Sequence, residues 1–267
     1  MIHLHSITRR TAEVSEQRFP FSVPVVRELA RLEFTAPVTF FVGENGSGKS
    51  TILEAIAAAA GLPSVGSHDV KHDPTLAAQR ELADVLRLSW ARKATRGFFL
   101  RAEDFFGFTR SVAKMRAELL AELDEVAVDY ASASPKAREL REGPIRTSLH
   151  EMERRYGADL DANSHGQSFL TLFKARFVPG GLYLLDEPEA PLSPQSQLGL
   201  MAMMKEMVAQ DAQFIVATHS PILLAFPDAT IYSFDVTPVA AVPYADLEHV
   251  NLTRDFLTAP DRFLRHL

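Results

Sequence analysis

The 267-residue sequence contains no cysteine, which excludes disulfide bonds and thiolate-ligated metal sites. No apolar run approaches the ~18 residues of a membrane span, and the first residues lack the basic and apolar regions of a secretory leader. Basic residues are fewer than acidic ones: 28 Lys and Arg against 34 Asp and Glu give a net charge of −6. We therefore expect a soluble cytoplasmic protein in which nucleic-acid binding would need a local basic patch.

Apolar residues are concentrated in short runs that predict the fold class. These runs are continuous rather than alternating, as in strands covered on both faces of a parallel sheet. Helical patterns lie between them, for example Thr51–Ala60, which stops at Gly61. The sequence therefore predicts an α/β fold with a mostly parallel sheet flanked by helices. The expected strands are Val38–Val42, Phe98–Leu100, Leu182–Leu185, Phe214–Ala217 and Ile231–Phe234.

The middle of the chain has a different pattern. From Ser111 to Tyr130, apolar residues recur every three or four positions, which marks one face of a helix. Pro144 stands where a second helix can begin. We expect an inserted all-helical lobe at residues 109–165, between core segments 1–108 and 166–267.

A glycine-rich segment follows the first expected central strand. It matches the phosphate-binding pattern G-x-x-x-x-G-K-[ST] between a strand and a helix. Glycines let backbone N–H groups approach one phosphate, and the helix N-terminus adds about half a positive charge. Lys49 would reach the β- and γ-phosphates, and the Ser50 hydroxyl would ligate Mg²⁺. The residues expected to bind the ATP phosphates are Gly43, Glu44, Asn45, Gly46, Ser47, Gly48, Lys49, Ser50 and Thr51.

Polar residues follow two other apolar runs. Asp186 ends the run from Leu182, a strand that we expect beside the strand of the glycine-rich loop, and there its carboxylate can hold Mg²⁺ through water. The next residue, Glu187, could polarise a water for attack on the γ-phosphate. His219 follows Phe214–Ala217 and could bond that phosphate or water, although a lone histidine is more often a structural group.

Three further segments allow more than one interpretation. Ser164-His165-Gly166-Gln167 precedes an apolar-periodic segment; it fits either an anion-binding turn or simply a capped helix start. Ser67–Asp73 holds two His and two Asp but is more typical of a polar loop than of a metal site. The phenylalanines between Phe98 and Phe108 have no interleaved basic run, since only Arg101 and Arg110 accompany them, and this favours core packing over base stacking.

The order and spacing of these motifs resemble the ATP-binding-cassette (ABC) class of P-loop ATPases. The Walker A loop is followed by a signature-like Ser164–Gln167, by a Walker B Asp186 nineteen residues later and by a switch His219 after thirty-three more. Glu187–Pro194 and Ala217–Pro221 resemble the soluble branch of that class. This branch includes chromosome-maintenance and recombination ATPases and the overcoming-lysogenisation-defect group.

The resemblance implies a Mg²⁺-dependent ATPase that works as a head-to-tail homodimer with two ATP molecules between its subunits. Walker A of one chain and Ser164–Gln167 of the other would hold each ATP, and Lys49, Glu187 and His219 would be catalytic. The inserted segment is too short for the long coiled-coil arms of chromosome-maintenance proteins.

This sequence departs from the family pattern at several positions. His165 stands where the signature usually has glycine, and Ser193 occupies the D-loop position that usually holds aspartate. No clear Q-loop glutamine follows Phe98–Leu100, although Glu103 could substitute for it. Phe19 and Phe21 are candidate adenine contacts that fit core positions equally well.

Three functions remain open on the sequence. The first is a soluble ATPase whose dimerisation switches an unidentified protein partner. The second is the nucleotide-binding subunit of an ABC membrane transporter. The third is a DNA-repair or phage-defence ATPase, for which the overall charge offers no support.

Overall fold

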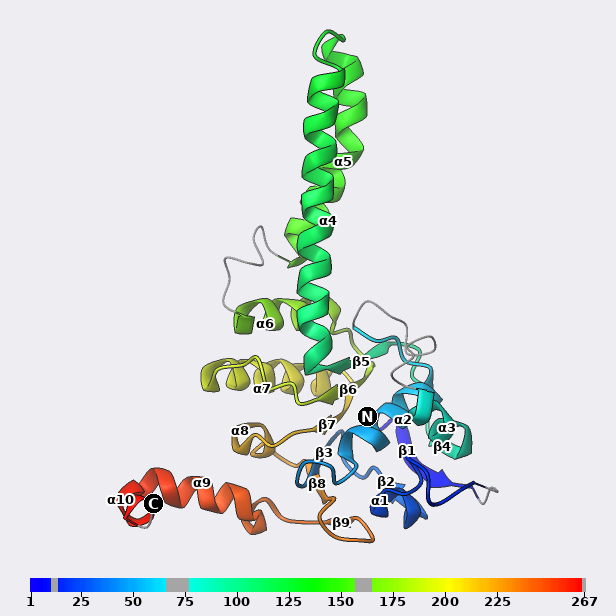
Figure 1. The fold of residues 1–267 in the computed structure, drawn as a ribbon, viewed down its shortest axis with the longest axis vertical. Helices are drawn as coiled ribbons and strands as arrows, with labels where there is room; N and C mark the ends of the chain where they lie inside the picture. The colour runs from blue at the N-terminus through cyan, green and yellow to red at the C-terminus, as the bar shows by residue number, and fades with distance from the viewer. Residues whose placement is uncertain (11–13, 66–76, 157–164, 266–267) are drawn as a thin grey trace.

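A six-stranded, mostly parallel sheet forms the centre of the molecule (Figure 1). The computed structural model describes residues 1–10, 14–65, 77–156 and 165–265. The strand order is β5-β6-β7-β3-β8-β9, and only β9 runs antiparallel to its neighbour. The five parallel strands coincide with the five predicted apolar runs, which confirms the predicted α/β class. The strands are β3 (Val38–Val42), β5 (Gly97–Arg101), β6 (Leu182–Asp186), β7 (Gln213–Ala217), β8 (Thr230–Ser233) and β9 (Ala240–Ala241).

A second, three-stranded antiparallel sheet has the order β2-β1-β4 and was not predicted. Its strands are β1 (Leu4–Arg9), β2 (Arg31–Glu33) and β4 (Leu86–Trp90). Together with α1 (Pro24–Arg27), α2 (Lys49–Ala60) and α3 (Ala77–Val85), it covers one face of the central sheet. The buried side chains of this layer include Phe34, Phe41 and Ile52.

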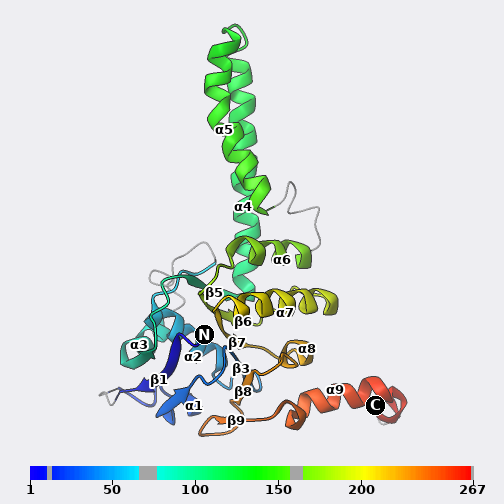
Figure 2. The same ribbon diagram turned by 180° about the vertical axis from the view of Figure 1, so that it is seen from behind.

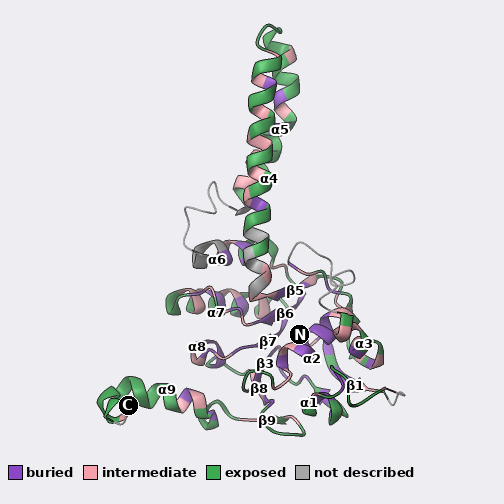
Figure 3. Cartoon of the chain, viewed as in Figure 1, coloured by how far each residue is buried: buried purple, intermediate pink, exposed green. Residues whose placement is uncertain are grey.

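The other face of the central sheet packs against α6 (His165–Arg176) and α7 (Pro194–Ala209). Figure 3 shows this buried layer beneath α7. The Phe98 ring stacks on Phe177 with centroids 5.8 Å apart and meets Tyr183 edge-on at 5.0 Å. Phe98 and Phe99 are buried, which confirms core packing for these two phenylalanines.

Helices α4 (Ala102–Asp129) and α5 (Pro135–Tyr156) form a hairpin that projects from the core (Figures 1 and 2). The prediction that a helix begins at Pro144 is wrong, because α5 begins at Pro135 and contains Pro144. Proline removes the N–H that would bond the Leu140 carbonyl, but Leu140 is exposed, so water can satisfy that carbonyl. Two residues before Pro144, the buried Glu142 carboxylate accepts hydrogen bonds from Arg138 at 2.6 Å and from Arg146 at 2.9 Å. These bonds lower the pKa of Glu142. The boundaries 109–165 for a separate lobe stay a prediction.

After β7 the chain forms α8 (Pro221–Leu224), the 3₁₀ helix η2 (Tyr244–Asp246), α9 (Glu248–Thr258) and α10 (Pro260–Leu264). Helices α9 and α10 extend away from the sheet (Figure 2). Among the described residues, no helix is both long enough and apolar enough to cross a membrane.

Replacing Gly97 with alanine is expected to destabilise the fold by about 3 kcal/mol. Gly97 has φ +130°, and an added Cβ would lie 1.8 Å from the carbonyl oxygen of Leu182, where β5 pairs with β6. Gly180 is a matched control, because its φ is +68° and nothing lies within 4 Å of an added Cβ. Gly180→Ala should therefore cost only about 1 kcal/mol of backbone strain. Equal midpoints of urea unfolding for the two variants would contradict this account.

Candidate nucleotide site

The glycine-rich loop, here called the cradle, runs from the end of β3 to the start of α2. Helix α2 begins at Lys49, two residues before the predicted start at Thr51. Gly43, Gly46 and Gly48 all have positive φ. A Cβ on Gly48 would lie 2.6 Å from Val25, so the close approach as well as the dihedral requires glycine there. The loop has the local geometry that the motif predicts.

Hydrogen bonds from Lys49 connect the first turn of α2 to this loop. Its buried Nζ donates to the carbonyl oxygens of Gly43 at 2.6 Å and Glu44 at 2.9 Å. Burial lowers the pKa of Lys49, and the charges of nearby acids, Glu187 and Asp186 first, oppose that shift. A phosphate entering the cradle would give the ammonium an anionic partner in place of two carbonyls.

Ser50 and Asp186 bring a hydroxyl and a carboxylate together beside the cradle. Ser50 Oγ donates to Asp186 Oδ1 at 3.1 Å, and Asp186 is only 8% exposed. Burial raises the pKa of Asp186 to about 6; the Ser50 hydrogen bond opposes this shift and the Glu187 charge adds to it. A bound divalent cation would stabilise the charged form of this buried carboxylate. The carboxylate and the Ser50 hydroxyl are both oxygen ligands, which Mg²⁺ prefers.

The expectation that the strand of Asp186 lies beside the cradle's strand is wrong. Strand β7 separates β6 from β3, so Asp186 reaches the cradle through the side chain of Ser50. Within the described residues, no group of three or more His, Asp and Glu could hold a metal. Mg²⁺ would therefore take its remaining ligands from phosphate oxygens and water.

Glu187 and His219 lie together at the carboxyl ends of β6 and β7. His219 Nε2 is 4.0 Å from Glu187 Oε1, and both side chains are partly open to solvent. Glu187 has a positive φ of 48°, and its N–H donates to the Ala217 carbonyl at 2.9 Å. Left-handed backbone is unusual for a non-glycine residue and is concentrated at functional sites. This arrangement can hold a water between an acid and an imidazole.

The two candidate adenine contacts differ in their exposure to solvent. Phe19 is 46% exposed, so it stays a proposed adenine contact. Phe21 is 4% exposed, packs in the core and carries the Arg9 guanidinium 5.6 Å from its centroid. Its role as an adenine contact is therefore wrong, because no face of the ring is free for a base.

Other predicted residues fall partly outside the described structure. Ser164 lies outside it, and His165, Gly166 and Gln167 form the start of α6. Glu103 lies in the first turn of α4 and stays a proposed Q-loop residue. Ser67–Asp73 lies outside the described residues.

The structure adds two acids that the sequence reasoning missed. Asp235 Oδ1 accepts the Glu44 N–H of the cradle at 2.7 Å. Glu189 Oε1 accepts the N–H of His219 at 2.7 Å. Asp235 follows the apolar run Ile231–Phe234 as Asp186 follows its own run, so the same rule could have found it. Glu189 carries no comparable signal.

Asparagine at position 186 should stabilise the metal-free protein above pH 6. Because folding raises the pKa of Asp186, the folded state favours the protonated form, and stability is lost as pH rises from about 4 through 6. Asp186→Asn removes this loss of unfolding free energy, which is on the order of 2–3 kcal/mol at pH 7.5. Urea unfolding in EDTA at pH 4.5 and 7.5 measures it, with exposed Asp84→Asn as the control. An equal gain at both pH values would contradict the cause.

Two protein-family models match this chain. Residues 21–133 match an "AAA domain", and residues 167–225 match "AAA domain, putative AbiEii toxin, Type IV TA system". Among curated relatives, the macrolide export ATP-binding/permease protein MacB of Hahella chejuensis is 27% identical over 82% of this chain and 31% of its own length. MacB of Escherichia coli K12 is 26% identical over 95% of this chain and 36% of its own length. The chain thus spans about a third of these relatives.

Solved structures were also compared with the fold. The ATP-binding cassette MJ1267 of an ABC transporter aligns with a TM-score of 0.48 and 17% identity, covering 95% of this chain and 99% of that one. The Smc head domain from Pyrococcus furiosus aligns with a TM-score of 0.46 and 14% identity, covering 96% and 100%. The phosphate cradle, the contact of Ser50 with Asp186, the two matching AAA-domain models and the ATP-binding relatives together support an ABC-class P-loop ATPase domain.

Proposed function

We propose that this domain binds and hydrolyses ATP with Mg²⁺ and uses the nucleotide to switch a partner protein. The observation that carries the proposal is the contact between Ser50 and Asp186 beside the buried Lys49. Together they offer a hydroxyl, a carboxylate and an ammonium, the groups that hold a magnesium-bound triphosphate in P-loop enzymes.

Each residue has a distinct task in this proposal. Lys49 exchanges the carbonyls of Gly43 and Glu44 for phosphate oxygens, while N–H groups of the loop bind the same anion. Ser50 and Asp186 would hold Mg²⁺, which supplies charge neutralisation at the phosphates when bound. Glu187 accepts the proton of the attacking water, and His219 bonds the water or the γ-phosphate.

The proposal includes an ATP-dependent, head-to-tail homodimer. The N-terminus of α6, at His165, would meet the γ-phosphate bound by a second copy and offer it N–H groups and a positive dipole. Hydrolysis then removes the anion that joins the two surfaces. The cytoplasm remains the predicted location.

Phosphate release by the purified protein tests the proposal directly. ATP with Mg²⁺ should yield phosphate, EDTA should stop release, and light scattering should show dimers only with ATP. Absence of nucleotide binding in calorimetry would overturn the proposal.

A second candidate is the nucleotide-binding part of a membrane exporter. The similarity to MacB, an ATP-binding/permease protein, favours it, although this chain spans about a third of that length. Copurification of a polytopic membrane protein from a detergent extract would place this candidate first.

A further inference from the structure

The C-terminal segment packs directly behind the turn that carries His219. Tyr244 Oη donates to the carbonyl oxygen of Pro221, two residues beyond His219, at 3.0 Å. Leu247 and Val250 are buried in the same apolar cluster as Leu223 and Leu224 of α8. The start of α9 is therefore fixed against the switch turn and does not form a loose tail.

These contacts bring His249 to the nucleotide site. Burial lowers the pKa of His249, the charge of His219 lowers it further and the charge of Asp235 opposes the shift. The His249 Nε2 is buried and has no hydrogen-bond partner among the described residues. Asp235 in turn accepts the Glu44 N–H of the cradle. His249 thus lies between the buried Leu247 and Val250, on the segment that packs behind the switch turn.

We propose that His249 is a positioning residue that couples α9 to the nucleotide site. A neutral ring at this position adds no charge behind the switch turn and leaves Asp235 free to hold Glu44. A cation at position 249 would compete with the Glu44 N–H for Asp235. Displacement of α9 would disturb the same contacts, so ATP turnover would depend on what happens to this helix. This role rests on the proposed ATPase activity.

Lysine at position 249 tests the coupling. His249→Lys is expected to lower kcat on the order of tenfold, whereas His249→Gln, which stays neutral and can form hydrogen bonds, should keep most of it. Leu252→Lys is the matched control, since it adds the same charge to α9 at a side chain that is 56% exposed. Circular dichroism checks folding, and if His249→Lys does not fold, His249→Gln is compared with His249→Ala.

The outcomes separate this inference from the proposed function. If the wild-type protein releases no phosphate, the proposed function fails and the positioning role fails with it. If the wild type is active and His249→Lys matches Leu252→Lys, or glutamine rescues no better than alanine, only the role of His249 is overturned.

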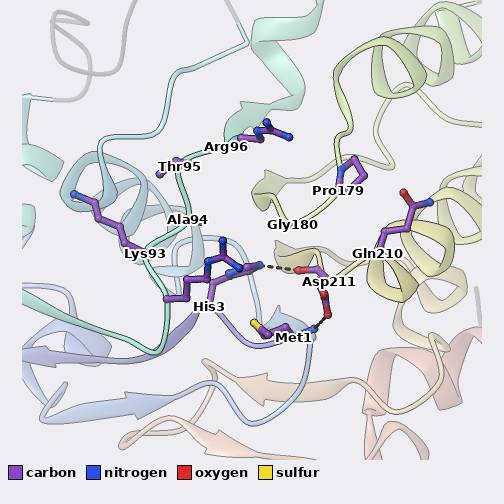
Figure 4. A pocket seen from close by; sticks show the side chains of 11 residues that line it. Met1, His3, Lys93, Ala94, Thr95, Arg96, Pro179, Gly180, Gln210 and Asp211 are labelled. Atoms are coloured by element: carbon purple, nitrogen blue, oxygen red, sulfur yellow. Dashed lines mark hydrogen bonds and ion pairs between the residues drawn. The ribbon is translucent and has the colours of Figure 1, made fainter.

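A second, independent observation concerns the opposite end of the sheet. A pocket of about 390 Å³ opens at the amino-terminal ends of β5, β6 and β7, away from the cradle (Figure 4). Gln213 stabilises its wall, because its Oε1 accepts hydrogen bonds from the N–H groups of His3 and Leu4 at 2.8 Å. His3 Nε2 lies 2.6 Å from the Asp211 carbonyl oxygen. The shape of the pocket is therefore set by hydrogen bonds between distant segments.

Positive charge dominates the lining of this pocket. Arg92, Lys93 and Arg96 are exposed on the connection from β4 to β5, and none forms an ion pair with another described residue. The one carboxylate in the lining, Asp211, lies 3.4 Å from the amino nitrogen of Met1. In a chain of net charge −6, three uncompensated cations around one concavity mark an anion site.

We propose that this pocket binds a phosphate group of a small phosphorylated molecule. A concave site of this volume fits a small ligand better than the backbone of a duplex. Tripolyphosphate, AMP and a single-stranded 20-mer DNA distinguish the sources of the phosphate, with Lys49→Ala as background to weaken the cradle.

Calorimetry on two triple variants tests the site. Arg92→Gln/Lys93→Gln/Arg96→Gln should lose at least tenfold in affinity for tripolyphosphate or AMP, whereas Lys136→Gln/Arg141→Gln/Arg154→Gln, which removes the same charge from the hairpin, should not. Equal affinities in the two variants, or no binding by the background protein, would overturn the proposal. Binding of the DNA alone would overturn the small-molecule assignment.

Discussion

Replacing Glu187 with glutamine is expected to reduce ATP turnover by at least 100-fold while ATP remains bound. The amide keeps the size of the side chain but cannot accept a proton from the attacking water. Because Lys49, Ser50 and Asp186 are untouched, affinity for ATP with Mg²⁺ should stay within a few-fold of the wild type. Phosphate release under saturating ATP and calorimetry on the same sample measure the two quantities separately.

The same variant should accumulate as a dimer, since the anion that joins two subunits is not removed. Light scattering with ATP and Mg²⁺ should show a dimer for Glu187→Gln and a monomer after EDTA is added. Glu206→Gln, at an exposed position of α7, is the control for loss of one charge and should behave as the wild type. If Glu187→Gln hydrolysed ATP at the wild-type rate, Glu187 would not be the catalytic base.

The parallel sheet could be predicted because its strands are buried on both faces. Continuous apolar runs such as Val38–Val42 and Leu182–Leu185 leave little alternative, and the ends of these runs place Asp186 and His219 at one edge. The local pattern could not give the strand order. Only the structure shows that β7 lies between β6 and β3, so that the Ser50 side chain joins cradle and acid.

The small antiparallel sheet could not be predicted, because its pairing is non-local and its strands are weakly patterned. Strand β1 pairs with β4, nearly eighty residues away, and β4 has a buried residue only at its start. At Pro144 a local signal was present but misleading, because proline predicts a helix start and the helix continues through it. Packing of α5 on α4 and the hydrogen bonds to Glu142 stabilise the helix there.

The position of His249 was also beyond sequence reasoning. It lies thirty residues after His219 in a segment with no phosphate or metal motif. Only tertiary packing of Leu247 and Val250 on α8 brings it to the site. Residues that act through others carry no motif, because their role depends on the fold and not on their neighbours in the chain.

Replacing Lys49 with alanine is expected to weaken ATP binding on the order of 100-fold, so turnover should become undetectable at ordinary ATP concentrations. The variant loses the one buried cation of the cradle, while three acids, Asp186, Glu187 and Asp235, stay close to where the triphosphate would lie. It also loses both bonds that hold the Gly43 and Glu44 carbonyls, so the empty loop should become less ordered. Calorimetry with ATP and Mg²⁺ and amide exchange of the loop measure these effects.

Two controls show whether the position or the charge matters. Lys205→Ala removes an exposed lysine from α7 and should leave binding unchanged. Lys49→Arg keeps the charge but places a larger, planar group in a buried site with two carbonyl partners, and it should restore binding only in part. Lys49→Ala and Glu187→Gln must also differ from each other, because the first loses the nucleotide and the second retains it. If both variants bound ATP equally well, the ammonium would have no part in holding the phosphates, and the cradle would lose its function.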